Sequence, residues 1–136
     1  MSVNHRPIVM VVEDDVEMNE LEREFMALYG LDAVAAYTGL EAIDLFQRRK
    51  ADAVLLDVML PEMDGFETCR RLRGMNNGHT PIVILTALDA EDCRNTGYKA
   101  GADAYFAKPF DPDEVVETLR DLIRRNYTPS TGEDRS

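Results

Sequence analysis

The sequence predicts one α/β domain, with a parallel sheet that carries helices on both faces. Short apolar runs of strand length alternate five times with longer segments in which apolar residues recur at helical spacing. Such alternation implies right-handed crossovers and strands that all point the same way. The chain has 136 residues, of which 45% are apolar, and this suits a single domain with a substantial core.

The predicted strands are apolar runs bounded by turn residues. The central run, Ala53 to Leu56, is long enough to be buried on both faces, and it ends at Asp57. The second run is the weakest, because it is rich in alanine and carries Asp32. Pro81 opens the fourth run, where proline is tolerated at the first residue of a strand. The expected strands are 8–12, 31–36, 53–57, 81–86 and 103–107.

The predicted helices follow from capping residues and apolar spacing. Thr38 with Glu41, and Asp64 with Glu67, have the spacing of capping boxes. The expected helices begin near 15 or 16, 38, 64, 89, and 111 or 112, and the one at 89–100 has the weakest pattern. Their expected inward residues are Met18, Leu21, Phe25 and Leu28; Ala42, Ile43 and Phe46; Phe66, Cys69 and Leu72; and Val115, Val116, Leu119, Leu122 and Ile123.

The charge balance excludes several classes of protein. A net charge of −11 argues against direct nucleic-acid binding and against an anionic membrane surface. No apolar run reaches the ~18 residues of a membrane span, and the N-terminus lacks a signal-peptide core. Two cysteines, Cys69 and Cys93, fall in predicted helices and are expected to be free thiols. We expect a cytoplasmic domain over 1–127, with 128–136 a disordered tail or the stub of a linker.

The predicted topology brings chemical groups together at one edge of the sheet. In a parallel sheet the C-terminal ends of all strands share an edge, which is where open α/β sheets place their ligands. Those ends carry Glu13, Asp14, Asp57, Thr86 and Lys108. Residues distant in the sequence are therefore expected to meet in one acidic pocket.

The chemistry of this set points to phosphoryl transfer. Three close carboxylates repel one another, and Mg²⁺ is the expected partner because it needs few protein ligands and keeps several waters. Lys108 adds an ammonium group, and Thr86 adds a hydroxyl. A divalent ion, an ammonium and a hydroxyl around one carboxylate suit the three oxygens of a phosphoryl group. Asp57 is then placed to act as the nucleophile that accepts it.

Five motifs resemble the receiver domain of two-component response regulators, over about residues 7–126. They are Glu13-Asp14, the segment Leu55 to Pro61 around Asp57, Asp64-Gly65, Leu85-Thr86-Ala87 and Lys108-Pro109-Phe110. The resemblance implies a flavodoxin-like, doubly wound sheet of strand order 2-1-3-4-5. It also implies a cis peptide bond between Lys108 and Pro109.

The resemblance assigns a role to each group in the pocket. Asp57 would take the phosphoryl group from a phosphohistidine on a sensor histidine kinase or phosphotransfer protein. Asp14 and Asp57 would contact Mg²⁺ through their side chains, Met59 would do so through its backbone carbonyl, and Glu13 would act largely through a bound water. Lys108 would pair with the acids and then with the phosphoryl group. The protein would catalyse only its own phosphorylation and slow dephosphorylation.

The resemblance also implies a switch made of Thr86 and Tyr105. Phosphorylation would turn Thr86 toward the new oxygens and Tyr105 inward. The helix at 89–100, the fifth strand and the last helix would then present an altered surface to a downstream partner or output domain, or to a second copy in a homodimer. The poor helix formers at 95–97 would let that helix shift at low energy. The alternative explanation is that Gly97 is there only because a small residue eases the packing of this helix.

Two apolar residues predict a long-lived phosphorylated state. In the resembled family the path of attacking water passes the residues two beyond the acceptor and two beyond the switch threonine. Here these are Met59 and Leu88, neither of which can hydrogen-bond a water.

Other functions fit less well. A small-molecule phosphatase with an aspartyl-phosphate intermediate needs a second Asp where Met59 stands. A flavodoxin-like binder of nucleotide or flavin needs a phosphate-cradling loop after the first strand, where Glu13, Asp14 and Asp15 would repel phosphate. A degenerate receiver that signals without phosphate is disfavoured because every matching position is intact.

Overall fold

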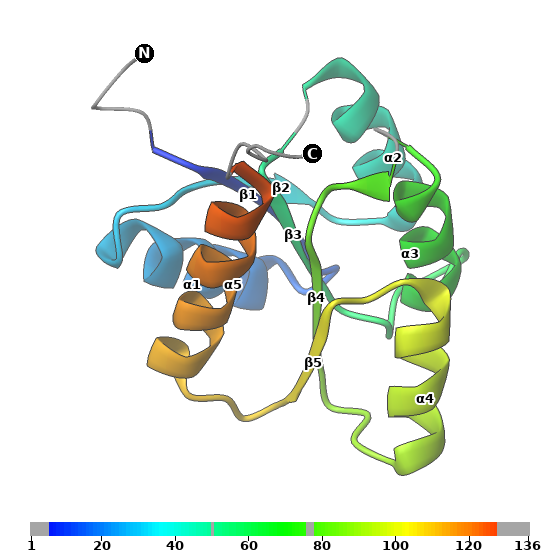
Figure 1. Ribbon diagram of the computed structural model, residues 1–136. Coiled ribbons are helices and arrows are strands. Elements are labelled where there is room, and N and C mark those ends of the chain that lie inside the picture. The colour runs from blue at the N-terminus through cyan, green and yellow to red at the C-terminus, as the bar shows by residue number, and fades with distance from the viewer. Residues whose placement is uncertain (1–5, 50, 76–77, 128–136) are drawn as a thin grey trace.

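The protein folds as a five-stranded parallel sheet in the order β2-β1-β3-β4-β5 (Figure 1). This computed structural model describes residues 6–49, 51–75 and 78–127. The sheet order and the cis peptide bond between Lys108 and Pro109 are as predicted. The strands are β1 Ile8–Val12, β2 Asp32–Ala36, β3 Ala53–Leu56, β4 Ile82–Thr86 and β5 Ala104–Ala107.

A helix follows each strand, and the helices form a layer on either face of the sheet. Figure 1 shows α1 and α5 on one face and α2, α3 and α4 on the other. All five predicted helices are present, and each begins within two residues of the expected position. They are α1 Val16–Leu28, α2 Gly39–Arg48, α3 Gly65–Arg73, α4 Glu91–Ala100 and α5 Pro112–Tyr127.

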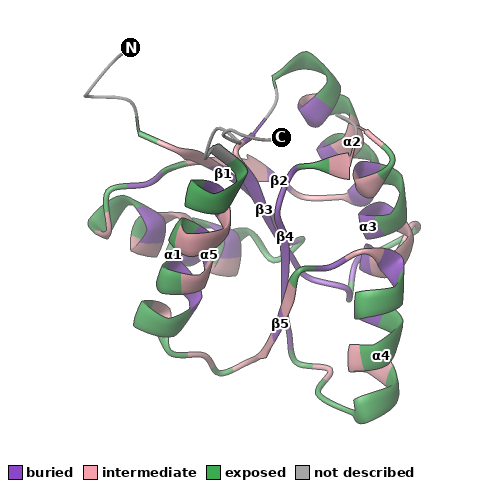
Figure 2. Ribbon diagram, viewed as in Figure 1, coloured by how far each residue is buried: buried purple, intermediate pink, exposed green. Residues whose placement is uncertain are grey.

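Two apolar clusters bury the two faces of the sheet. Successive residues of a strand point to opposite faces, so Leu55 joins the cluster under α1 and α5, whereas Leu56 joins the one under α2, α3 and α4. All residues of β3 and β4 are buried (Figure 2). This burial explains why their sequences are continuously apolar rather than alternating.

The predicted N-caps form, and at α2 the acidic residue of the expected capping box reaches back to the residue before the N-cap. Thr38 Oγ1 accepts the N–H of Glu41 at 3.0 Å, and the Glu41 carboxylate accepts the N–H of Tyr37 at 2.7 Å. At α3, Asp64 Oδ1 accepts the N–H of Glu67 at 2.9 Å. The Glu67 carboxylate instead pairs with two arginines further along the helix, Arg70 and Arg71, each at 3.0 Å. The expected box at α3 is therefore half formed, because the arginines compete for its carboxylate.

The inward face of α1 differs from the prediction. The structure buries Asn19, Glu22 and Met26 on this helix. Leu21 and Leu28, expected inside, are 43% and 79% exposed. The helix is rotated relative to its most apolar stripe because the sheet edge beneath it offers polar partners, described below.

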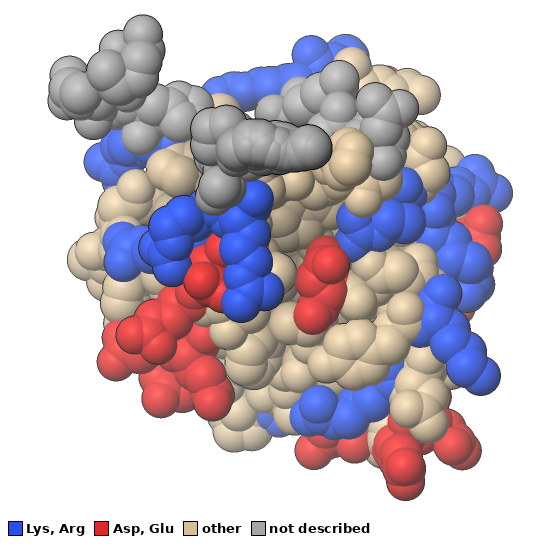
Figure 3. Space-filling model, in the orientation of Figure 1, with Lys and Arg blue, Asp and Glu red and all other residues tan. Residues whose placement is uncertain are grey.

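Charges on α5 are sorted along the helix. Asp113 and Glu114 lie in its first turn, and Arg124 and Arg125 in its last, which complements the helix dipole. On the face in Figure 3 acidic side chains gather at the lower left, where α5 begins, and a second acidic group lies at the lower right. No helix in the described ranges is both long and apolar enough to cross a bilayer. The expected tail, 128–136, lies outside the described residues.

Candidate functional site

The strand register places the predicted site residues side by side. Val12 pairs with Leu56, so the residues that follow them, Glu13 and Asp57, leave the sheet next to each other. The backbone ladder continues one step further, since the Asp57 N–H donates to Val12 O at 3.0 Å. On the far strand the Lys108 N–H donates to Thr86 O at 2.8 Å. Three of the functional residues are therefore anchored by main-chain bonds to neighbouring strands.

Gly65 allows α3 to begin close to the acceptor strand. Its N–H donates to Val58 O at 3.0 Å. A Cβ added to Gly65 would lie 2.3 Å from both Asp57 O and Val58 Cα, closer than any real contact. The Asp64-Gly65 motif thus serves packing at the floor of the site, and only glycine fits there.

Lys108 joins the acids of the site. Its Nζ lies 2.6 Å from Glu13 Oε1 and 3.1 Å from Asp57 Oδ2, and the side chains of Glu13 and Asp57 are 4% and 9% exposed. A third acid, Glu22 of α1, places Oε2 at 3.7 Å from the same ammonium group. The other oxygen of Asp57 accepts the N–H of Met59 at 3.0 Å. Both oxygens of the predicted acceptor therefore have a positioned donor.

The surroundings lower the pKa of Asp57 and raise the pKa values of Glu13 and Lys108. Burial alone would raise the pKa of Asp57, but the Met59 N–H, the Thr86 hydroxyl and the Lys108 ammonium hold it below its ordinary value. Burial raises the pKa of Glu13, and the adjacent Asp57 adds to this against the opposing effect of Lys108. The pKa of Lys108 is raised despite burial, because of its hydrogen bond to Glu13 and its attraction to Asp57 and Glu22. Asp57 is thus ionised at neutral pH, and Lys108 is charged.

The donor set fits a hard cation such as Mg²⁺. In the described part of the chain no three His, Cys, Asp or Glu side chains form a ready-made metal cluster. Glu13 and Asp57 lie together at Lys108, and Asp14, which follows Glu13 in the chain, is exposed. Mg²⁺ is commonly held by one or two carboxylates, with waters and phosphate oxygens completing its shell. Oxygen donors of this kind and number suit it, and the ligand set expected from the sequence stays a prediction.

Both members of the predicted switch pair lie inward in this structure. Thr86 is fully buried; its Oγ1 accepts the N–H of Leu88 at 3.4 Å, and its hydroxyl lies close enough to Asp57 to help lower the pKa of that carboxyl. Tyr105 is 4% exposed, and its hydroxyl donates to Leu88 O at 2.6 Å. The tyrosine thereby ties β5 to the loop that follows β4. The predicted movement of the two residues stays a prediction.

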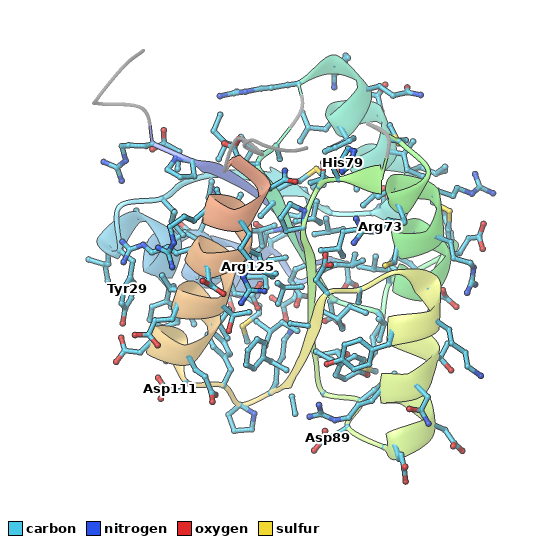
Figure 4. All side chains as sticks on the ribbon, in the orientation of Figure 1. Tyr29, Arg73, His79, Asp89, Asp111 and Arg125 are labelled. Carbon is cyan, nitrogen blue, oxygen red and sulfur yellow. The ribbon has the colours of Figure 1, made fainter. Side chains whose placement is uncertain are left out.

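Arg94 of α4 holds the Tyr105 ring in this position. Its guanidinium lies 5.0 Å from the ring centroid, and Nη1 donates to Tyr105 O at 3.2 Å. Arg94 also pairs with Asp89 at 2.7 Å, at the loop before α4 (Figure 4 labels Asp89). A Cβ on Gly97 would lie 2.9 Å from the ring, so glycine there provides the close approach. The packing explanation for Gly97 is therefore confirmed, whereas a mechanically weak helix stays a hypothesis.

The two residues of the predicted water path have different surroundings. Met59 is 53% exposed and follows the acceptor at the mouth of the site. Leu88 is half-buried and packs against the cluster beneath α2, α3 and α4. Its backbone, rather than its side chain, makes the contact with Tyr105.

Sequence reasoning missed two polar residues that serve the site. Asn19 Nδ2 donates to three carbonyls, those of Val11, Glu13 and Ala36, at 3.0 to 3.2 Å, and so holds the end of β1. Glu22 reaches Lys108 from the same helix face. A sign was present in the sequence: Asn19, Glu22 and Met26 share one helical stripe, although two of them are polar.

Comparison of the sequence with known families supports the geometry. The model of the response regulator receiver domain matches residues 9–120. The response regulator MprA of Mycobacterium sp. (strain KMS) is 41% identical over 126 residues, covering 93% of this chain and 54% of that protein. MprA of Mycobacterium tuberculosis (strain ATCC 25618 / H37Rv) is 41% identical over 117 residues, covering 86% and 50%. The chain thus spans about half the length of these curated relatives.

Solved structures of receiver domains have the same fold as this chain. The receiver domain of the Francisella response regulator 1452 superposes with a TM-score of 0.81 at 33% identity, covering 88% of this chain and 98% of that one. The receiver domain of sensor histidine kinase PA1611 from Pseudomonas aeruginosa PAO1 gives a TM-score of 0.81 at 29% identity, covering 88% and 99%. That structure has a magnesium ion coordinated in its active-site cleft.

Proposed function

The chain belongs to the response regulator receiver domain family, and from this premise we propose that Asp57 accepts a phosphoryl group from a sensor histidine kinase or phosphotransfer protein. The observation that supports the assignment most strongly is that Lys108 Nζ forms ion pairs with both Asp57 and Glu13, at 3.1 and 2.6 Å. It leaves a buried, ionised carboxylate with a cation beside it. The phosphatase alternative gains no support from the family or from its relatives and is set aside.

The transfer would be an in-line displacement at phosphorus. A carboxylate oxygen of Asp57 forms the new P–O bond while the P–N bond to the donor imidazole breaks, and the imidazole leaves with the electron pair. Lys108 would offset the charge of the phosphoryl oxygens, and the Thr86 hydroxyl would donate a hydrogen bond to one of them. Mg²⁺, held by Asp14, Asp57 and the Met59 carbonyl with Glu13 acting through water, would neutralise charge developing on the phosphoryl group. The protein would act on no separate substrate.

A protein donor would cover the apolar surface beside the acceptor. Lys108 forms one wall of a shallow groove between α1 and the loop that leads from β5 to α5. Leu21, which α1 leaves 43% exposed, lies in this groove. The other lining residues are Met18, Phe25, Pro109, Phe110 and Pro112. A kinase or phosphotransfer domain that docks here could bring its phosphohistidine to Asp57.

The signal would leave through α4, β5 and α5. Arg94 connects Tyr105 to α4 and to Asp89, so a movement of the Tyr105 ring would change the contacts of α4. We likewise propose that this surface binds a downstream partner, an output domain or, on phosphorylation, a second copy of the chain. We also propose the cytoplasmic location expected from the sequence.

The test is intact-protein mass after incubation with Mg²⁺ and acetyl phosphate. We expect wild type to gain one phosphoryl group, only when Mg²⁺ is present, and Asp57→Asn to gain none. Asp44→Asn, which changes an exposed acid on α2, is the matched control and should behave as wild type. Absence of both an adduct and Mg²⁺ binding in wild type would overturn the assignment.

A second prediction concerns the lifetime of the phosphorylated state. The apolar side chains at Met59 and Leu88 cannot orient a water, so the double variant Met59→Asn with Leu88→Glu should lose its phosphoryl group about tenfold faster. The rate is measured by mass after removal of the donor. Leu28→Asn, at an apolar position that is 79% exposed at the far end of α1, should leave the rate unchanged. An unaltered rate in the double variant would show that water access is set elsewhere.

A further inference from the structure

Glu22 is a buried carboxylate that the phosphoryl-transfer chemistry does not by itself require. It lies on the inward face of α1 and is 2% exposed. Its Oε2 atom has no hydrogen-bond partner among the described residues. Its one ion-pair partner there is Lys108, at 3.7 Å, which is too long for a hydrogen bond.

Such a group is costly to keep. A buried carboxylate in which one oxygen accepts no hydrogen bond, as is the case for Oε2 of Glu22, is less favourable than an apolar side chain of similar volume. Burial raises the pKa of Glu22 to about 7, against the opposing attraction of Lys108. Asn19, the other polar residue on this face, differs because its amide is fully used by three carbonyls. The packing of α1 therefore accounts for Asn19 but gives no reason for Glu22.

The geometry around Lys108 supplies a reason. An ammonium group has three N–H donors. Two of them are taken by Glu13 at 2.6 Å and Asp57 at 3.1 Å, both from strand ends. Glu22 lies 3.7 Å from the same ammonium group and comes from a helix, α1, rather than from a strand end. The ammonium group is thus enclosed by three acids from three different elements.

We propose that Glu22 is a positioning residue that holds the Lys108 ammonium beside Asp57 from the α1 side. The proposal rests on the function proposed above for Asp57. With Mg²⁺ bound, Glu13 would share its carboxylate with the metal site and would attract the Lys108 ammonium less strongly. Glu22, which is no part of the expected metal site, keeps its attraction for the ammonium. Lys108 then remains in reach of the phosphoryl oxygens instead of turning to solvent.

Two substitutions separate this role from a structural one. Glu22→Leu removes the charge and fills the same space, whereas Glu22→Gln keeps an acceptor oxygen without charge. We expect Glu22→Leu to be at least as stable to urea as wild type at pH 7.5 and to be phosphorylated by acetyl phosphate about tenfold more slowly at saturating Mg²⁺. Glu22→Gln should fall between the two in rate. Glu20→Leu, at an exposed position on the same helix, should match wild type in rate.

The position of Lys108 can be read without any phosphorylation. The chain has three lysines, Lys50, Lys99 and Lys108, so lysine-labelled protein gives few Cε and Nζ signals to assign. We expect only the Lys108 signals to move in Glu22→Leu, and to move less in Glu22→Gln. A wild-type rate in Glu22→Leu, or unmoved Lys108 signals, would overturn the proposal. If wild type accepts no phosphoryl group, the proposed function fails, and the Lys108 signals alone decide the positioning role.

Discussion

Replacing Lys108 with methionine is expected to lower the free energy of unfolding by about 3 to 5 kcal/mol at pH 7.5. The variant keeps most of the side-chain volume but leaves Glu13, Asp57 and Glu22 without their common cation. Uncompensated buried charge, rather than lost packing, would be the cause. Phosphorylation by acetyl phosphate should fall by roughly a hundredfold, because the same ammonium contacts the transferring oxygens.

The pH dependence of this loss has a definite sign. Glu22 has a raised pKa of about 7 in the folded wild type, against 4.5 in the unfolded chain. Without Lys108 the pKa values of Glu13 and Glu22 rise further, so these carboxyls take up protons as the pH falls. The stability deficit of Lys108→Met should therefore shrink from pH 7.5 towards pH 5.

Urea unfolding followed by circular dichroism at several pH values measures this. Lys99→Met, at an exposed position on α4, is the control and should stay within about 0.5 kcal/mol of wild type. Added Mg²⁺ should stabilise Lys108→Met more than wild type, because the ion replaces the missing positive charge. A variant as stable as wild type at pH 7.5 would mean that the three acids are not held as charges against Lys108.

Arg73→Ala is expected to lower the free energy of unfolding by about 2 to 4 kcal/mol, although Arg73 lies at the opposite edge of the sheet from Asp57. Figure 4 shows Arg73 pointing from α3 toward the sheet. Its Nη1 donates to Gly78 O and Thr80 O, both at 2.8 Å, and its Nε donates to Gly101 O at 3.0 Å. Its Nη2 binds the Asp103 carboxylate at 2.7 Å. One side chain thus ties the end of α3 to the two segments that lead into β4 and β5.

The loss follows from the geometry of the guanidinium group. Asp103 also accepts the N–H of Ile82 at 2.8 Å, so the start of β4 depends on the same cluster. Arg73→Lys should recover less than half of the loss, because a single ammonium cannot reproduce the planar set of donors. Arg70→Ala is the matched control: Arg70 sits on the same helix but is exposed and pairs only with Glu67 in the described structure. It should cost at most about 0.5 kcal/mol.

The two variants also differ in function. Since the Arg73 cluster lies away from the pocket, the folded fraction of Arg73→Ala should be phosphorylated within about twofold of the wild-type rate. Lys108→Met should remain slow however much of it is folded. A slow rate in folded Arg73→Ala would instead mean that the two edges of the sheet are coupled.

The sequence by itself determined the features that rest on local periodicity and on topology. Continuous apolar runs of strand length predicted β3 and β4, which the structure buries completely. Side-chain caps at Thr38 and Asp64 predicted where two helices begin. The parallel topology then brought Glu13, Asp57, Thr86 and Lys108 to one edge, because such a sheet aligns the ends of its strands.

Only the tertiary structure decided which face of α1 points inward and what Arg73 binds. The rotation of a helix about its axis depends on the surface on which it packs. The polar edge beneath α1 selects Asn19 and Glu22 over the apolar Leu21 and Leu28. The four partners of Arg73 lie 5 to 30 residues away in the chain. A set of distant carbonyls leaves no periodic trace in the sequence. The stripe of Asn19, Glu22 and Met26 is periodic, but its spacing does not show that this stripe faces inward, because that choice depends on contacts that exist only once the layers have assembled.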